Sequence, residues 1–129
     1  MPFSLAVRAG DPARIATPLL AVALPSDAPV PRVLKGLDRS LGGALTRAVR
    51  AKDFKGSRDE TLLLLSAGRG PQRVLLVGVG PSPQPVAITR AATLAGRRGN
   101  AMGVERMAFW AEGLRVLREQ NPEFFSGAP

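Results

Sequence analysis

The chain has 129 residues, a length that corresponds to one globular domain. It contains no Cys and no His, which excludes disulfides, thiolate metal sites and every catalytic arrangement that needs an imidazole. The net charge of +8 favours polyanionic partners, or simply keeps an Arg-rich surface hydrated. The longest apolar runs are far too short to cross a bilayer, and no targeting segment is visible. We therefore expect a cytoplasmic protein with no membrane partner.

The first part of the chain contains two predicted strands. Residues 3–8 (FSLAVR) form the first, and residues 10–12 (GDP) end it. Residues 19–24 (LLAVAL) form the second, between Pro18 and Pro25. An apolar run of this kind is typical of a strand that is covered on both faces. The three prolines within residues 25–31 (PSDAPVP) predict a loop.

The clearest helical periodicity lies in residues 37–49. Six positions share one apolar face: Leu37, Leu41, Ala44, Leu45, Ala48 and Val49. Arg39, Arg47 and Arg50 fall on the opposite face. Gly42 and Gly43 each cost about 1 kcal/mol relative to Ala inside a helix. Either the helix packs closely against another backbone at these glycines, or it begins near them.

The second half of the chain predicts two strands, a helix and a last strand. The strands are residues 61–66 (TLLLLS) and 73–79 (RVLLVGV), joined through residues 68–71 by a hairpin or a short crossing loop. A helix over residues 86–98 begins after Pro85, a residue suited to a first turn. Its face of small apolar side chains suits close packing on a sheet: Ile88, Ala91, Ala92 and Ala95.

Residues 106–110 (RMAFW) complete the predicted strands. This alternation of apolar strands with helices predicts an α/β domain, a three-layer αβα sandwich with a mixed sheet. Residues 111–129 are expected to form a C-terminal helix or tail. A short helix over residues 112–120 would end at Asn121 and Pro122.

A glycine-rich turn follows the strand at residues 73–79. Gly78 and Gly80 stand between a strand and a helix, where backbone N–H groups can bind phosphate. However, Pro83 occupies the position where the dinucleotide fingerprint requires a third glycine, and there is no Walker lysine. We therefore predict a turn here rather than a phosphate site.

Three acidic residues surround the Gly56 turn, namely Asp53, Asp59 and Glu60. Carboxylates can bind a cation or transfer protons. No other acid-rich segment supplies further ligands, so a solvated loop is favoured. We expect Glu60 to pair with a nearby Arg.

Positive charge is densest between residues 32 and 58, which contain eight Lys or Arg and two acids. Such a surface can contact phosphates, whereas base recognition would need interleaved aromatic residues, and only Phe54 is present. A solvated face is the simpler interpretation. The candidate nucleic-acid contacts are Arg39, Arg47, Arg50, Lys52, Lys55 and Arg58.

Several of these segments, in this order, resemble one known family. They are residues 38–45 (DRSLGGAL), 53–56 (DFKG), 60–63 (ETLL), 73–80 (RVLLVGVG) and 89–92 (TRAA). Together they resemble the amino-terminal domain of the leucyl (cytosol) aminopeptidase family, over residues 3–110. The resemblance implies a macro-domain-like fold for residues 1–110. Residues 111–129 would then begin the linker to a catalytic domain.

The resemblance also implies a function. Family members are two-metal aminopeptidases, usually hexamers, and some bind DNA. Their metal ligands, for two Zn or Mn ions, and their catalytic Lys and Arg lie in a separate carboxy-terminal domain. No stretch of this chain resembles the carboxylate-rich metal motif, so no catalytic residue, metal ligand or cofactor is assigned to it.

The implied role is therefore that of a non-catalytic domain that serves assembly or access to the catalytic domain. Its expected partners are a catalytic domain, in the same or another chain, and further copies in a homo-oligomer. The alternative is a stand-alone module that binds nucleic acid through its basic helix face. A nucleotide diphosphate bound near Gly78 and Gly80 is a third hypothesis, which rests on fold analogy alone.

Overall fold

A five-stranded mixed sheet forms the centre of the protein. The computed structural model describes residues 4–7, 12–66, 70–81 and 84–112. The strands are β1 (Ser4–Val7), β2 (Leu20–Leu24), β3 (Thr61–Leu65), β4 (Arg73–Gly78) and β5 (Arg106–Ala111). Their order in the sheet is β1-β5-β2-β4-β3, and only β3 runs antiparallel to its neighbour. The predicted mixed sheet is confirmed.

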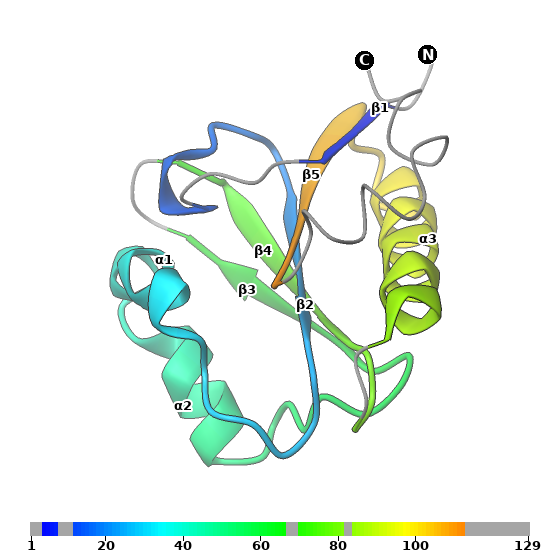
Figure 1. The fold of residues 1–129 in the computed structure, drawn as a ribbon. Helices are drawn as coiled ribbons and strands as arrows, with labels where there is room; N and C mark the ends of the chain where they lie inside the picture. The colour runs from blue at the N-terminus through cyan, green and yellow to red at the C-terminus, as the bar shows by residue number, and fades with distance from the viewer. Residues whose placement is uncertain (1–3, 8–11, 67–69, 82–83, 113–129) are drawn as a thin grey trace.

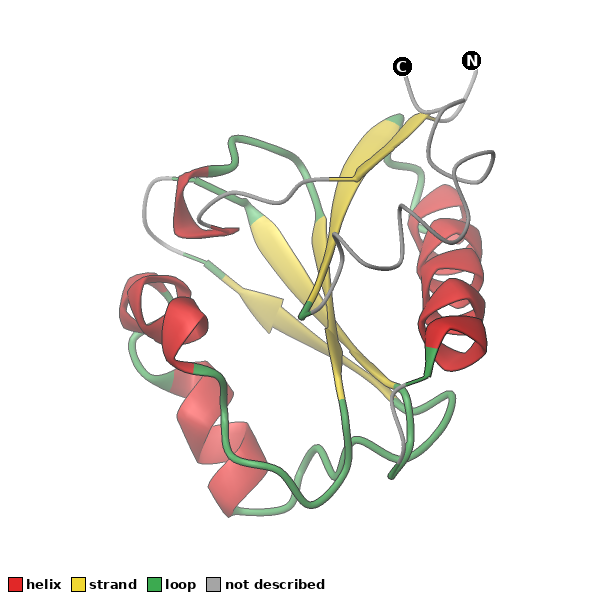
Figure 2. Ribbon diagram, in the orientation of Figure 1, coloured by secondary structure: helices red, strands yellow, loops and turns green. Residues whose placement is uncertain are grey.

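Helices cover both faces of this sheet. α1 (Lys35–Ser40) and α2 (Ala44–Arg50) lie on one face, and α3 (Pro85–Ala101) lies on the other (Figures 1 and 2). Two short 3-10 helices, Pro12–Arg14 and Arg32–Leu34, precede β2 and α1. The predicted three-layer αβα sandwich is confirmed. None of the helices within the described ranges is long and apolar enough to span a membrane.

The apolar strand β2 links two separate hydrophobic cores. All five of its residues are buried. Leu20, Val22 and Leu24 join the core under α1 and α2, whereas Ala21 and Ala23 join the core under α3. Alternate side chains of a strand point to opposite faces, so a strand with cover on both sides must be apolar throughout. This is the reason that LLAVAL has no polar position.

The α3 side of the sandwich is built from small side chains. Ile88, Ala91, Ala92 and Ala95 are buried as predicted, and they face the alanines of β2. Pro85 stands in the first turn of α3, where a missing N–H costs nothing. Small residues on both surfaces let the helix lie close to the sheet.

The hairpin between β3 and β4 is one of the two connections that the sequence left open. The two strands pair antiparallel, with Leu65 opposite Arg73. The predicted helix over residues 112–120 lies almost wholly outside the described residues.

The single helix predicted over residues 37–49 is wrong, because two helices meet there at a break. Gly42 and Gly43 have φ values of 66° and 80°, in the left-handed region that favours glycine. The second alternative from the sequence, a helix that begins near the glycines, therefore holds for α2. Asp38 stabilises the new start: its Oδ1 accepts hydrogen bonds from the N–H groups of Leu45 (3.0 Å) and Thr46 (3.2 Å).

We predict that removing this cap destabilises the domain. Asp38→Ala leaves two N–H groups in the first turn of α2 without their acceptor, so unfolding in urea should require about 1–2 kcal/mol less free energy. Asp38→Asn keeps an acceptor oxygen in the same place and should lose clearly less. Equal stability of the Ala variant and the parent would contradict this role of Asp38.

Candidate functional site

The carboxyl ends of β2 and β4 meet a loop at three glycines, Gly56, Gly78 and Gly80, here termed the glycine junction. The N–H of Gly80 donates to the carbonyl oxygen of Gly56 (2.9 Å), and the N–H of Val79 donates to that of Leu24 (3.1 Å). These bonds join the end of β4 both to the loop before β3 and to the end of β2. Ligands of open α/β sheets bind at this edge, outside the carboxyl ends of the strands.

Two of the junction glycines, Gly56 and Gly78, stand where a side chain would have no room, whereas a Cβ on Gly80 would make only ordinary contacts. A Cβ added to Gly78 would lie 1.9 Å from the carbonyl oxygen of Ser57. A Cβ on Gly56 would lie 2.4 Å from the carbonyl oxygen of Pro25. Gly56 and Gly80 also have left-handed φ values of 76° and 87°. The glycines therefore serve close contact between backbones.

Gly78 is the last residue of β4, and Gly80 follows two residues later with a left-handed φ of 87°. The N–H groups of Gly78, Val79 and Gly80 all donate to backbone carbonyl oxygens, that of Gly78 to Glu60 at 2.8 Å. Backbone donors that are already paired cannot also hold a phosphate without losing these bonds. This part of the turn is structural.

The loop before β3 is held by its own acidic residues. Oε1 of Glu60 accepts hydrogen bonds from the N–H groups of Lys55 (3.0 Å) and Ser57 (3.1 Å), and closes the DFKG loop. The expectation that Glu60 pairs with an Arg is wrong. Asp59 makes the arginine pair instead, with Arg90 of α3 at 2.6 Å.

The Asp59–Arg90 pair crosses from the β3 side of the sheet to α3. Both carboxylate oxygens of Asp59 accept from the guanidinium, at 2.9 and 2.6 Å. This two-point hydrogen bond lowers the pKa of Asp59 below its usual value and raises that of Arg90, with the charge attraction adding to both shifts. Because both side chains are well exposed, water screens the pair and it contributes little to stability.

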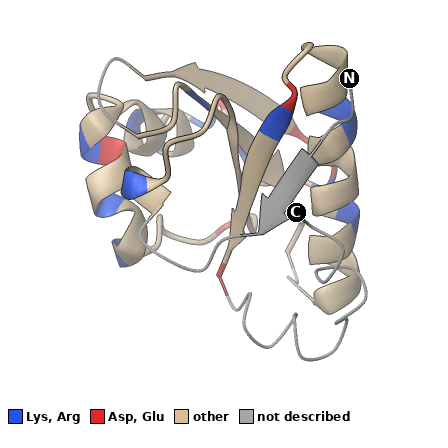
Figure 3. Cartoon of the chain, turned by 90° about the horizontal axis from the view of Figure 1, so that it is seen from above, with Lys and Arg blue, Asp and Glu red and all other residues tan. Residues whose placement is uncertain are grey.

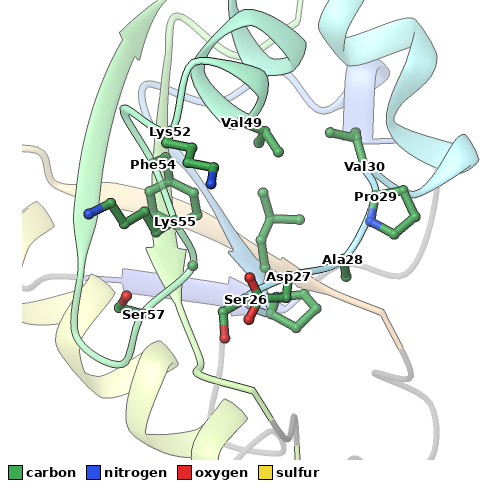
Figure 4. A pocket seen from close by; sticks show the side chains of 13 residues that line it. Ser26, Asp27, Ala28, Pro29, Val30, Val49, Lys52, Phe54, Lys55 and Ser57 are labelled. Carbon is green, nitrogen blue, oxygen red and sulfur yellow. The ribbon is translucent and has the colours of Figure 1, made fainter.

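A pocket of about 530 Å³ opens beside the glycine junction, on the side of α2 (Figure 4). We call it the β2 pocket, and it is lined by residues 24–30, Val49, Lys52 and residues 54–57. The proline-rich loop that follows β2 forms one wall, and the DFKG loop forms the other. Phe54, which is 2% exposed, anchors the DFKG loop in the core beneath α1 and α2.

Charged side chains stand at the rim of the β2 pocket. Figure 4 shows Lys52 and Asp27 extending toward the space between the two walls, whereas the amino group of Lys55 points away from it. Sequence reasoning predicted the loop of residues 25–31 but missed Asp27 as a candidate site residue. The prolines predicted this loop, but no pattern predicted that it faces the DFKG segment.

The six predicted cationic contacts are all exposed but do not form one helix face. Arg39 belongs to α1 and Arg47 to α2, so the break at the glycines separates them. The guanidinium of Arg47 also donates to the carbonyl oxygen of Gly42 (2.8 Å) and closes the turn between the helices. Figure 3 shows further Lys and Arg on the α3 side. Nucleic-acid contact by these residues stays a prediction.

The acidic residues Asp53, Asp59 and Glu60 lie in or next to the DFKG loop. Within the described residues, no group of three or more Asp, Glu, His or Cys side chains is placed to hold a metal ion. Asp59 and Glu60 have the structural partners given above. Asp59 and Glu60 therefore support the fold.

Comparison with known proteins decides the family. The profile of the N-terminal domain of the cytosol aminopeptidase family matches residues 21–125. This chain belongs to the cytosol aminopeptidase family. The resemblance predicted from the DFKG and RVLLVGVG segments is confirmed.

Two bacterial relatives cover most of the chain, and both are described as probable cytosol aminopeptidases. The protein from Roseiflexus castenholzii is 33% identical over 95% of this chain, and that from Syntrophotalea carbinolica is 41% identical over 69%. The chain spans only 23% and 15% of their respective lengths. Family membership therefore concerns the N-terminal part of these longer proteins.

Two solved structures share the fold. A mutant of tomato leucine aminopeptidase superposes on 85% of this chain with a TM-score of 0.67 and 22% identity, and the match covers 23% of that protein. The macrodomain of Mycobacterium tuberculosis DarG superposes on 96% with a TM-score of 0.64 and 11% identity, and the match covers 91% of that chain. The predicted macro-domain-like architecture is confirmed.

We predict that the glycine junction tolerates no Cβ at Gly78. Gly78→Ala places a methyl group against a backbone carbonyl, so the backbone must move, at a cost of about 3 kcal/mol in the free energy of unfolding. Gly42→Ala is the matched control: it meets only open space, although its φ is left-handed, and should cost about 1 kcal/mol. Chemical denaturation measures both. Equal losses would contradict the close contact at Gly78.

Proposed function

We propose that this protein acts as the non-catalytic amino-terminal domain of a leucyl aminopeptidase-type metallopeptidase, and that it serves assembly of the enzyme or access to its active site. The observation that carries the proposal is the match of residues 21–125 to the N-terminal domain of the family. Residues 1–110 form the domain, and residues 111–129 lead toward a catalytic domain in the same or another chain. The cytoplasm is the proposed location.

The closed architecture of the domain supports a role through its surface. Both faces of the sheet are covered by the chain's own helices, so neither core needs side chains from a second domain. The described residues also bring together no metal-binding cluster. The two divalent ions of the proposed enzyme would therefore be held by residues of the catalytic domain.

The edge strand β3 supports assembly in particular. It pairs with β4 on one side, and its sequence, TLLLL, has no charge, Pro or Gly that would oppose a further strand. Leu63 is 41% exposed and Leu65 is 74% exposed. Exposed leucines on a sheet edge of this kind favour contact with another protein surface.

Two measurements test the proposal. The chain alone should not hydrolyse leucyl p-nitroanilide in the presence of Mn²⁺ or Zn²⁺, because its described residues form no cluster that could hold a metal ion. Next, the chain replaces the matching segment of the Roseiflexus castenholzii relative, and light scattering follows the assembly of this chimera. We expect the chimera to be an active oligomer.

A charge on β3 should weaken that oligomer. Leu65→Lys places an ammonium group in the proposed contact and should lower the association constant at least tenfold, which is about 1.4 kcal/mol. Val86→Lys is the matched control, because Val86 on α3 is equally exposed. Metal-dependent turnover by the chain alone would overturn the non-catalytic role. An unchanged oligomer in the Leu65→Lys chimera would overturn the role of β3.

A further inference from the structure

Two strained charged residues line the β2 pocket. Among the described residues, three that are not glycine have left-handed φ values: Asp27 (57°), Lys52 (60°) and Asp59 (66°). Asp59 is held by its pair with Arg90. Asp27 and Lys52 both line the β2 pocket. Backbone strain of this kind persists where the side chain is needed, so it points to a function for the pocket.

Lys52 occupies a position that glycine fills in many helices. It directly follows Ala51, the residue that caps the C-terminus of α2. A residue there often turns left-handed, and glycine does so without steric cost. A lysine at this position has a strained backbone, but it also provides a long cationic side chain. Figure 4 shows this side chain beside Phe54. The choice of Lys over Gly therefore favours a role for the ammonium group.

The two charges have opposite signs. Neither Asp27 nor Lys52 makes a side-chain hydrogen bond or ion pair with any residue that the structure describes. The side chains of Val30, Val49 and Phe54 also line the pocket. The pocket thus combines apolar side chains with one carboxylate, which can bind a cationic group, and one ammonium group, which can bind an anionic group. Sites for small molecules likewise combine apolar side chains with a few polar groups.

We propose that the β2 pocket binds a small zwitterion with an apolar body, an amino acid or a short peptide. The ammonium group of the ligand pairs with the Asp27 carboxylate, and its carboxylate pairs with the Lys52 ammonium. Its aliphatic or aromatic side chain packs on Val30, Val49 and Phe54. The hydroxyl groups of Ser26 and Ser57, which also line the pocket, supply further hydrogen bonds.

The charges of the pocket decide between this ligand class and others. A phosphate or a simple carboxylate would meet the repulsion of Asp27, and a divalent cation would find one carboxylate beside the positive charge of Lys52. A zwitterion satisfies both side chains at once. The volume of about 530 Å³ lies within the range of small-molecule sites and accommodates an amino acid or a dipeptide.

Isothermal titration of the chain with L-leucine and L-leucyl-L-leucine tests the proposal and separates the two sources of ligand. At least one should bind saturably. Leucinamide lacks the carboxylate and 4-methylpentanoate lacks the ammonium group. If leucine is the ligand, each should bind at least tenfold more weakly than leucine. If the dipeptide is the ligand, leucyl-leucinamide, which lacks its carboxylate, should bind at least tenfold more weakly than the dipeptide. The absence of saturable binding by both zwitterions would overturn the proposal.

Variants of the rim assign the contacts. Asp27→Asn and Lys52→Gln keep size and backbone conformation but remove one charge each, and each should lower affinity at least tenfold. Lys55→Gln is the matched control, because its amino group points away from the pocket. Equal effects of the Lys52 and Lys55 variants would show a general charge effect and would overturn the assignment.

Lys52→Gly separates function from folding. Glycine relieves the left-handed strain, so the midpoint of thermal unfolding should rise by a few degrees while ligand binding is lost. A purely structural lysine would instead lower the midpoint when removed, and this result would overturn the proposed role. The binding assays use the chain alone, so their outcome is independent of whether the domain assembles with a catalytic domain.

Discussion

The close approach of three backbone segments at Gly56, Gly78 and Gly80 is the constraint on which this domain depends. The end of β4 bonds to the end of β2 and to the loop before β3 at the same point. Close-packed backbones leave no space for a side chain at Gly56 and Gly78, and the left-handed φ of Gly80 favours glycine there. The junction fixes both walls of the β2 pocket relative to the sheet. Architecture and candidate site therefore share one set of contacts.

Polar contacts elsewhere in the domain act at the ends of elements rather than in the cores. Asp38 caps α2, Glu60 closes the DFKG loop, and Asp59 joins this loop to α3. The two cores are built almost entirely from apolar side chains. This division leaves the charged surface available for partners, and it explains why many segments that identify the family are structural. Asp27 and Lys52 differ from Asp38, Asp59 and Glu60, because neither side chain makes a hydrogen bond or ion pair with any residue that the structure describes.

The sequence predicts the layers well because periodicity reports burial. The run LLAVAL is apolar at every position since β2 is covered on both faces, and the alanines of α3 indicate its close packing. The break at Gly42 and Gly43 was harder to place. A local pattern of apolar residues continues across it, whereas the left-handed glycines and the cap from Asp38 fix where α2 begins.

The candidate site was less predictable for a similar reason. The sequence assigned Lys52 only to a generic basic face. It predicted a loop around Asp27 but gave no role to Asp27 itself. The two come from segments far apart in the chain, which meet at the glycine junction. Left-handed φ values at Asp27 and Lys52 are also invisible in sequence, because glycine marks such positions and neither residue is glycine.

Hydrogen exchange of the backbone amides at the glycine junction is the most direct measurement of this account. If the junction holds the domain together, the N–H groups of Gly78, Val79 and Gly80 exchange only through global unfolding. They are then protected as strongly as Leu76, in the centre of the sheet. Rapid exchange of these three amides, at the rate of exposed loop amides, would show that the junction opens independently of the core and would contradict the account.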